Sequence, residues 1–232
     1  MSDARGPLAA RTVVADGLTV DLYDVPDPVG GVVLLHGAGS RRQNHAAVAA
    51  ALQTAGLAVA VPDQRGHGDS AGGPDGRLDG RAVEDVATVA ALLPPGPRLL
   101  RGASMGGLLA LLAAERVGAR AVVAICPAAP RMLAARLAEG AYDAAVDPAP
   151  LRALLDAADP VAAVAALGER LLLVHAAGDE VVPVAHSRAL HAQSGGRSSL
   201  VVLPGGDHPS TGHDPAVVAL GARFLRGWAA EG

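Results

Sequence analysis

Short apolar runs alternate with longer amphipathic segments along most of this chain. The short runs are rich in Val, Leu and Ala and are bounded by glycine, proline or polar residues, as buried strands are. The longer segments repeat their apolar residues at helical spacing. Continuous apolar strands that alternate with helices predict an α/β fold, in which a mainly parallel central sheet has helices on both faces.

The same pattern assigns strands and helices in a definite order. We expect strands at residues 11–15, 18–25, 31–35, 57–61, 98–101, 120–126, 170–175 and 199–203. We expect helices at residues 44–55, 78–93, 105–116, 184–193 and 215–228. The first two strands flank Asp16-Gly17, which is a strong hairpin signal, so an antiparallel hairpin should lead the sheet.

One long connection, residues 127–168, interrupts this alternation and should contain two or three short helices. Asp159 followed by Pro160 predicts the start of one of them, because aspartate caps helices and proline fits the first turn. Connections of this length are often lids or binding elements. We therefore expect a single α/β domain over residues 1–232, with a small lid insertion at about residues 127–168.

Composition narrows the functional classes. Half of the 232 residues are apolar, which is enough for a sizeable core. The net charge is −4 without a basic run, so nucleic acid is not an expected partner. Residues 1–11 contain no apolar signal segment and no long apolar run follows, so we expect a cytoplasmic protein without membrane insertion. The oligomeric state stays open.

The single cysteine, Cys126, has no partner for an internal disulfide and is expected to be a small buried side chain. The chain contains neither a cofactor motif nor a Cys/His cluster at metal-ligand spacing, so no cofactor and no metal is expected.

The sequence Gly102-Ala103-Ser104-Met105-Gly106 stands between an expected strand and an expected helix. Small residues on both sides of a serine allow a sharp strand-to-helix turn that exposes the hydroxyl. Such a serine can act as a nucleophile if a base, an acid and oxyanion donors lie nearby. We therefore expect Ser104 to be the catalytic nucleophile.

The loops after the other parallel strands supply candidates for these partners, because the carboxyl ends of parallel strands meet at one edge. The glycines around Ala38 leave backbone N–H groups free, so Ala38 and Met105 are the expected oxyanion donors. Asp179 follows the strand at 170–175 and is the expected acid, and His208 follows the last strand and is the expected base.

Chain order separates His208 from the other histidines. In this architecture the base follows the acid, which excludes histidines before Asp179. His213 is the remaining rival, because His186 and His191 belong to a helix with polar neighbours and should be solvated. Asp207 should stabilise its loop.

A further polar loop, residues 63–70, reads Asp-Gln-Arg-Gly-His-Gly-Asp-Ser. Its charges and glycines predict a tight hydrogen-bonded turn, so we expect structural roles for Asp63, Arg65 and His67.

From about Gly31 onward the chain resembles the α/β-hydrolase superfamily. The resemblance depends on five motifs in order: HGAG at 36–39, DQRGHGDS at 63–70, GASMGG at 102–107, GDEVVP at 178–183 and GGDHP at 205–209. It looks most like small carboxylesterases, monoacylglycerol-lipase-like proteins and dienelactone-hydrolase-related esterases. The resemblance implies a Ser-His-Asp triad and an oxyanion hole at the positions named above.

The expected function is hydrolysis of small carboxylic esters through an acyl-enzyme on Ser104. Met132 and Tyr142 are the expected pocket residues of the lid, and because Tyr142 is its single aromatic we expect short or medium aliphatic acyl groups. A thioesterase or acyltransferase could use the same triad. A ligand-binding protein without hydrolytic activity is the alternative of another class.

Overall fold

The computed structural model describes residues 10–71, 76–142 and 144–230. Its strands are β1 (Arg11–Ala15), β2 (Leu18–Tyr23), β3 (Gly30–Leu35), β4 (Leu57–Pro62), β5 (Arg98–Ala103), β6 (Ala119–Ile125), β7 (Leu171–Ala176) and β8 (Ser199–Leu203). Its α-helices are α1 (Ala46–Thr54), α2 (Ala82–Ala90), α3 (Met105–Ala113), α4 (Pro130–Ala138), α5 (Pro148–Ala157), α6 (Pro160–Leu167), α7 (Val184–Gln193), α8 (His208–Thr211) and α9 (Pro215–Ala230).

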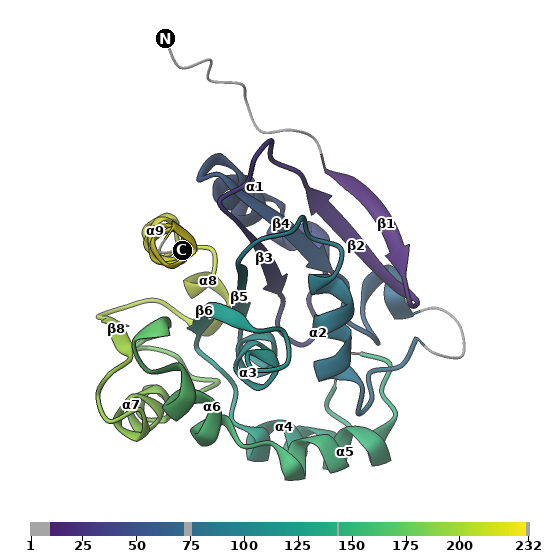
Figure 1. Ribbon diagram of the computed structural model, residues 1–232. Coiled ribbons are helices and arrows are strands. Elements are labelled where there is room, and N and C mark those ends of the chain that lie inside the picture. The colour runs from purple at the N-terminus through teal and green to yellow at the C-terminus, as the bar shows by residue number, and fades with distance from the viewer. Residues whose placement is uncertain (1–9, 72–75, 143, 231–232) are drawn as a thin grey trace.

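These strands form one sheet in the order β1-β2-β4-β3-β5-β6-β7-β8 (Figure 1). The hairpin β1–β2 is antiparallel, with Val13 opposite Val20, and β2 pairs antiparallel with β4. The pairs from β4 through β8 are parallel. The α/β class with a leading antiparallel hairpin, expected from the hydrophobic pattern, is confirmed.

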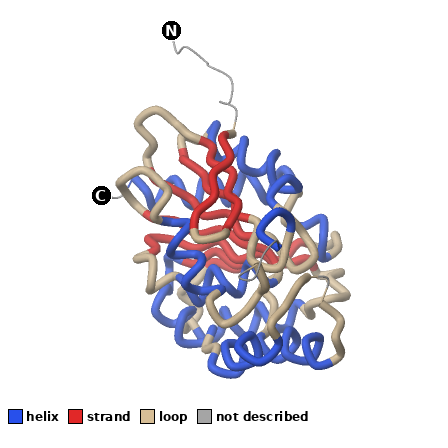
Figure 2. Tube along the Cα trace, turned by 90° about the vertical axis from the view of Figure 1, so that its right-hand side faces the viewer, coloured by secondary structure: helices blue, strands red, loops and turns tan. Residues whose placement is uncertain are grey.

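Helices cover both faces of the sheet (Figures 1 and 2). Helices α1 and α9 pack on one face, whereas α2, α3 and α7 pack on the other. Two hydrophobic cores lie on the two faces of the sheet, and alternate residues of β3 pack into them. Val33 and Leu35 belong to one core, and Val32 and Leu34 belong to the other. A strand buried on both faces needs this continuous apolar sequence.

Tertiary pairing shortens one expected helix. The segment 78–93 is helical only over Ala82–Ala90, because Leu78 forms a bridge with Val146 and donates its N–H to Ala145 O at 2.8 Å. Strand β2 ends at Tyr23 rather than at residue 25.

The long connection contains α4, α5 and α6, and Asp159 caps α6 by accepting the N–H of Ala162 at 2.9 Å. Helices α4 and α5 pack on each other beyond one end of the sheet (Figure 1). Across the described ranges, each helix is too short or too polar to cross a membrane. Most of residues 1–11, in which no signal segment is expected, lies outside the described residues.

The loop after β4 is fixed by buried ion pairs. Arg65 is 1% exposed and donates from Nε to Asp85 at 2.9 Å and from Nη2 to Asp16 at 2.8 Å. Asp63 accepts the N–H of Arg42 at 2.7 Å and also forms an ion pair with its guanidinium. These contacts agree with a structural role for the loop.

Replacing Arg65 by Met should destabilise the fold, because Asp85 would lose its buried partner. We expect a loss of about 3 kcal/mol in the free energy of unfolding, measured by urea denaturation. The control is Arg152→Met, which breaks the exposed Arg152–Asp156 pair and should cost less than about 0.5 kcal/mol. Equal effects of the two substitutions would contradict this account.

Candidate active site

Ser104 occupies the turn between β5 and α3 in a backbone conformation that side chains rarely adopt, with φ 55° and ψ −121°. Such a conformation costs roughly 1–3 kcal/mol and persists only where the surroundings hold it. The N–H of Ser104 donates to Ile125 O at 3.0 Å, and its carbonyl accepts from Leu108 N at 3.1 Å and Ala128 N at 3.0 Å. The neighbouring elements therefore hold the turn on both sides.

Glycines are required around this turn because the backbones approach closely. A Cβ on Gly102 would lie 2.1 Å from Gly106 O, and one on Gly106 would lie 2.3 Å from Leu35 O. A Cβ on Gly37 would lie 3.2 Å from the Cβ of Ser104. Glycine at these positions lets the loop after β3 lie directly beside the serine.

The loops after β7 and β8 bring Asp179 and His208 together. His208 Nδ1 donates to Asp179 Oδ2 at 2.7 Å, which leaves Nε2 as the available ring nitrogen. Asp179 Oδ1 accepts the N–H groups of Val181 at 2.9 Å and Val182 at 2.8 Å. Burial opposes the charge, but hydrogen bonds from His208, Val182 and the thiol of Cys126 outweigh it and lower the pKa of Asp179.

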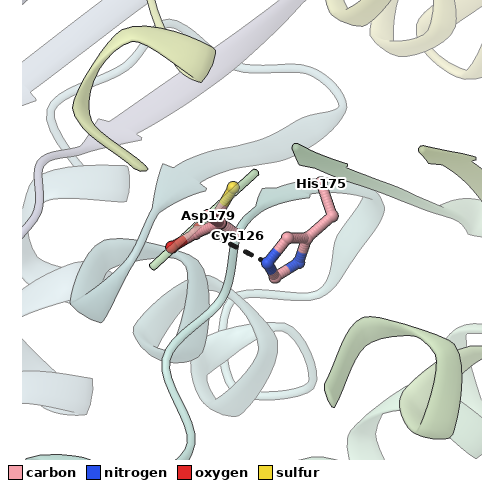
Figure 3. A group of neighbouring side chains, drawn as sticks. All are labelled: Cys126, His175 and Asp179. Atoms are coloured by element: carbon pink, nitrogen blue, oxygen red, sulfur yellow. Dashed lines mark ion pairs between the residues drawn. The ribbon is translucent and has the colours of Figure 1, made fainter. Parts of the chain in front are cut away.

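Two side chains that sequence reasoning did not place at the site support this carboxylate (Figure 3). His175 Nε2 lies 3.4 Å from Asp179 Oδ2 and donates to Val182 O at 2.8 Å, while Nδ1 accepts from Ser187 Oγ at 2.7 Å. Cys126 is 1% exposed, and burial raises its thiol pKa to about 12. The thiol is therefore a neutral donor.

Cys126, His175 and Asp179 offer sulfur, nitrogen and oxygen atoms within 4.8 Å of one another, a set that could in principle ligate a metal. The hydrogen bonds described above already engage these atoms: His175 Nε2 faces Val182 O, and Asp179 Oδ2 faces His208. Hydrogen bonds among the described residues therefore account for the orientations of Asp179 and His175.

Ser104 and His208 line the same cavity, which has a volume of about 150 Å³. Ala38 also lines it, as do Met132 and Tyr142, the two residues expected in the pocket. The side chain of Met105 lies instead in an adjoining apolar pocket. Its backbone N–H, at the first position of α3, has no partner within the helix.

A larger groove of about 980 Å³ lies at the opposite ends of the strands, near Arg98 and Ala119 where β5 and β6 begin. None of the candidate catalytic residues lines it. The cavity of about 150 Å³ is the one that Ser104 and His208 line.

The positions of the other histidines that follow Asp179 argue against their acting as the base. His213 precedes α9 and contacts His45, with ring centroids 4.8 Å apart, rather than Asp179. His186 and His191 are half-buried, so the expectation that they are solvated is wrong. His191 Nδ1 hydrogen-bonds Ser198 Oγ at 2.9 Å, a contact that depends on the fold beyond its own helix.

Asp207 caps α8 by accepting the N–H of Ser210 at 2.8 Å.

Two buried histidines, His36 and His45, lie at the loop after β3. His36 donates from Nδ1 to Gly37 O at 2.8 Å and accepts the N–H of Gln64 at Nε2, at 3.0 Å. Burial lowers the pKa of His36 to about 4 and that of His45 to about 3. Both rings are therefore neutral supports of the loop near neutral pH.

The family model described as "Serine aminopeptidase, S33" matches residues 26–141. This segment contains Ala38, Ser104 and Met105, whereas Asp179 and His208 lie beyond it. A curated, uncharacterised protein of Mycobacterium tuberculosis is 29% identical over 212 residues, which cover 86% of this chain and 73% of the relative.

Solved structures share the fold. Est1E from Butyrivibrio proteoclasticus with bound ferulic acid superposes with a TM-score of 0.75, at 23% identity, over 96% of this chain and all (100%) of that one. XC6422 from Xanthomonas campestris, described as an α/β serine hydrolase without a lid, has a TM-score of 0.66, at 21% identity, over 96% of each chain. At these identities the likeness shows the α/β-hydrolase fold.

The buried histidines should make the fold sensitive to acid. His36 and His45 have folded-state pKa values below the ordinary 6.5, so only the unfolded chain binds protons as the pH falls below that value. Their contribution is fully present above 6.5 and is lost as the pH falls toward about 4 for His36 and about 3 for His45.

Between about pH 7 and pH 5, each of these histidines should lower the free energy of unfolding by roughly 2 kcal/mol. Urea denaturation at several pH values measures this. His45→Gln should remove its share of the pH dependence, whereas the control Ser199→Ala, at an exposed residue that does not titrate in this range, should retain the wild-type dependence. An equally steep dependence in His45→Gln would contradict the assignment.

Proposed function

Because the chain belongs to the family described as serine aminopeptidase, S33, and has the α/β-hydrolase fold, we propose that it cleaves carboxylic esters through an acyl-enzyme on Ser104. The family and the fold support hydrolase activity, and we add to it an ester substrate and a triad of Ser104, His208 and Asp179. The observation that carries it is the 2.7 Å bond from His208 to Asp179, at a cavity that both His208 and Ser104 line.

In the first half-reaction, His208 Nε2 accepts the proton of Ser104 as Oγ bonds to the acyl carbon. Asp179 accepts Nδ1–H of His208, so the tautomer is correct for this transfer. The carbon–alcohol bond then breaks, and the departing alkoxide takes the proton from His208. The alcohol leaves and the acyl group stays on Ser104.

In the second half-reaction, water gives a proton to His208 and its oxygen bonds to the acyl carbon. The bond to Ser104 Oγ breaks, Oγ regains the proton, and the carboxylic acid leaves. In both steps the N–H groups of Ala38 and Met105 stabilise the oxyanion. Removing one such donor typically lowers turnover ~100- to 1000-fold.

We assign the acyl pocket to the cavity under the proposed lid, residues 127–168. Its described lining is mostly aliphatic and includes Met132, Val181 and Val182. Tyr142 is its single aromatic side chain. This supports short or medium aliphatic acyl groups rather than aromatic ones such as the ferulic acid bound to Est1E.

The family description raises peptides as an alternative class. An aminopeptidase must hold a positively charged amino terminus, for which a carboxylate is the natural partner. The described residues that line the cavity include no carboxylate side chain, and they include the cation Arg136. Esters therefore suit the site better than amino-terminal peptides. Thioester hydrolysis and acyl transfer would use the same groups and differ only in substrate or acceptor.

A fluorophosphonate probe should label wild-type protein at Ser104, because such probes react with activated serines. Ser104→Ala should lose both labelling and ester turnover, and His208→Gln and Asp179→Asn should lower kcat by roughly 10³-fold or more. Ser199, exposed at the start of β8, gives the control Ser199→Ala, which should keep full activity. Turnover that survives in Ser104→Ala would refute the assignment, as would absence of labelling in the wild type.

A series of p-nitrophenyl esters from acetate to palmitate, with benzoate and cinnamate included, tests the acyl pocket. We expect kcat/KM to be highest for short or medium chains, because a cavity of about 150 Å³ has room for few carbon atoms. A preference for cinnamate or palmitate would overturn this part of the proposal alone.

A further inference from the structure

The lid side of the cavity has a charge that ester hydrolysis does not use. Arg136 of α4 is the one permanently charged side chain among the described residues that line it. The other described lining residues are apolar except Ser104, His208 and Tyr142. A cation at an otherwise aliphatic cavity favours ligands that carry a negative charge.

The guanidinium of Arg136 is oriented by a backbone carbonyl and forms no ion pair with the residues that the structure describes. Its Nε donates to Ala141 O at 3.4 Å and its Nη2 donates to the same oxygen at 3.1 Å. Nη1 makes no hydrogen bond to the described residues, and no acidic side chain among them forms an ion pair with Arg136. By contrast, Arg42 and Arg65 are paired with aspartates. Arg136 thus has donor capacity left for a ligand.

Tyr142 adds a second donor at the same place. Its hydroxyl is buried and has no hydrogen-bond partner among the described residues. Burial raises the pKa of Tyr142 to about 12, and the nearby charge of Arg136 acts in the opposite direction, so the hydroxyl is neutral. A buried hydroxyl without a partner is costly, and an acceptor brought by a ligand would satisfy it.

We propose that Arg136 and Tyr142 form a subsite for a carboxylate, and that the preferred substrates are esters with a carboxylate remote from the scissile bond. A carboxylate can accept from a guanidinium and from a hydroxyl at once, which a neutral alkyl end cannot do. The subsite rests on the proposed ester hydrolysis, because it selects among esters. It places the anion at the lid and the scissile carbonyl at Ser104.

Matched ester pairs test this specificity. Monoethyl adipate and ethyl hexanoate have the same chain length and differ by a terminal carboxylate in place of a methyl group. The corresponding pairs from succinate to suberate cover different distances between the lid and Ser104. The measured quantity is the ratio of kcat/KM for the anionic ester to that for the neutral one.

Arg136→Gln should lower this ratio about tenfold for the best pair, mainly through KM, because a charge-assisted hydrogen bond is lost. Arg136→Lys should retain part of the ratio, and Tyr142→Phe should lower it about threefold. The control Arg131→Gln removes an exposed charge from the same helix, outside the cavity lining, and should leave the ratio within about twofold. A ratio unchanged in Arg136→Gln for every pair would overturn the subsite.

A binding measurement separates this inference from the catalytic proposal. Isothermal titration of Ser104→Ala protein with each ester needs no turnover. Tighter binding of monoethyl adipate than of ethyl hexanoate, reduced in Ser104→Ala/Arg136→Gln, is the expected result even if the wild type hydrolyses neither ester. Equal binding of the two esters across the whole series would refute the carboxylate subsite, whatever the turnover.

Discussion

The backbone of Ser104 is the constraint on which the rest of the site depends. A φ of 55° at a serine is tolerated only because β5 and α3 meet there and three hydrogen bonds hold the turn. Glycines at 102 and 106 permit the approach, and parallel pairing of β3 with β5 brings the HGAG loop alongside. Strain at one residue is thus supported by the buried central strands β3 and β5.

The site has a negative charge on Asp179 and a positive charge on Arg136, at different places. Asp179 stays ionised although it is buried, because backbone N–H groups, His208 and Cys126 all donate to it. This negative charge lies behind the cavity, where it orients a histidine. The positive charge of Arg136 lies on the α4 side of the cavity. In the proposed ester complex, the two charges face different parts of the substrate.

The features that the sequence alone predicts are those that depend on local pattern and chain order. Buried strands appear as continuous apolar runs, the turn at Ser104 appears in its small neighbours, and Asp179 and His208 follow from their order after the serine. The environment of Asp179 was not predictable, because Cys126 and His175 meet only through the pairing of β6 with β7. The shortened α2 has a similar cause, since a distant segment pairs with Leu78. Likewise, the docking of α4 decides that Arg136, rather than Arg131, lines the cavity.

The sheet order places His208 and Ser104 in regions of unequal cooperativity. Ser104 follows β5, which has a paired strand on each side, whereas His208 follows β8, an edge strand that is only partly buried. Amide hydrogens of edge elements exchange through local openings of lower free energy than global unfolding. Fraying of β8 would separate the histidine from an intact strand-to-helix turn. The fold would then pass through an intermediate opening in which the serine keeps its native geometry but is separated from His208.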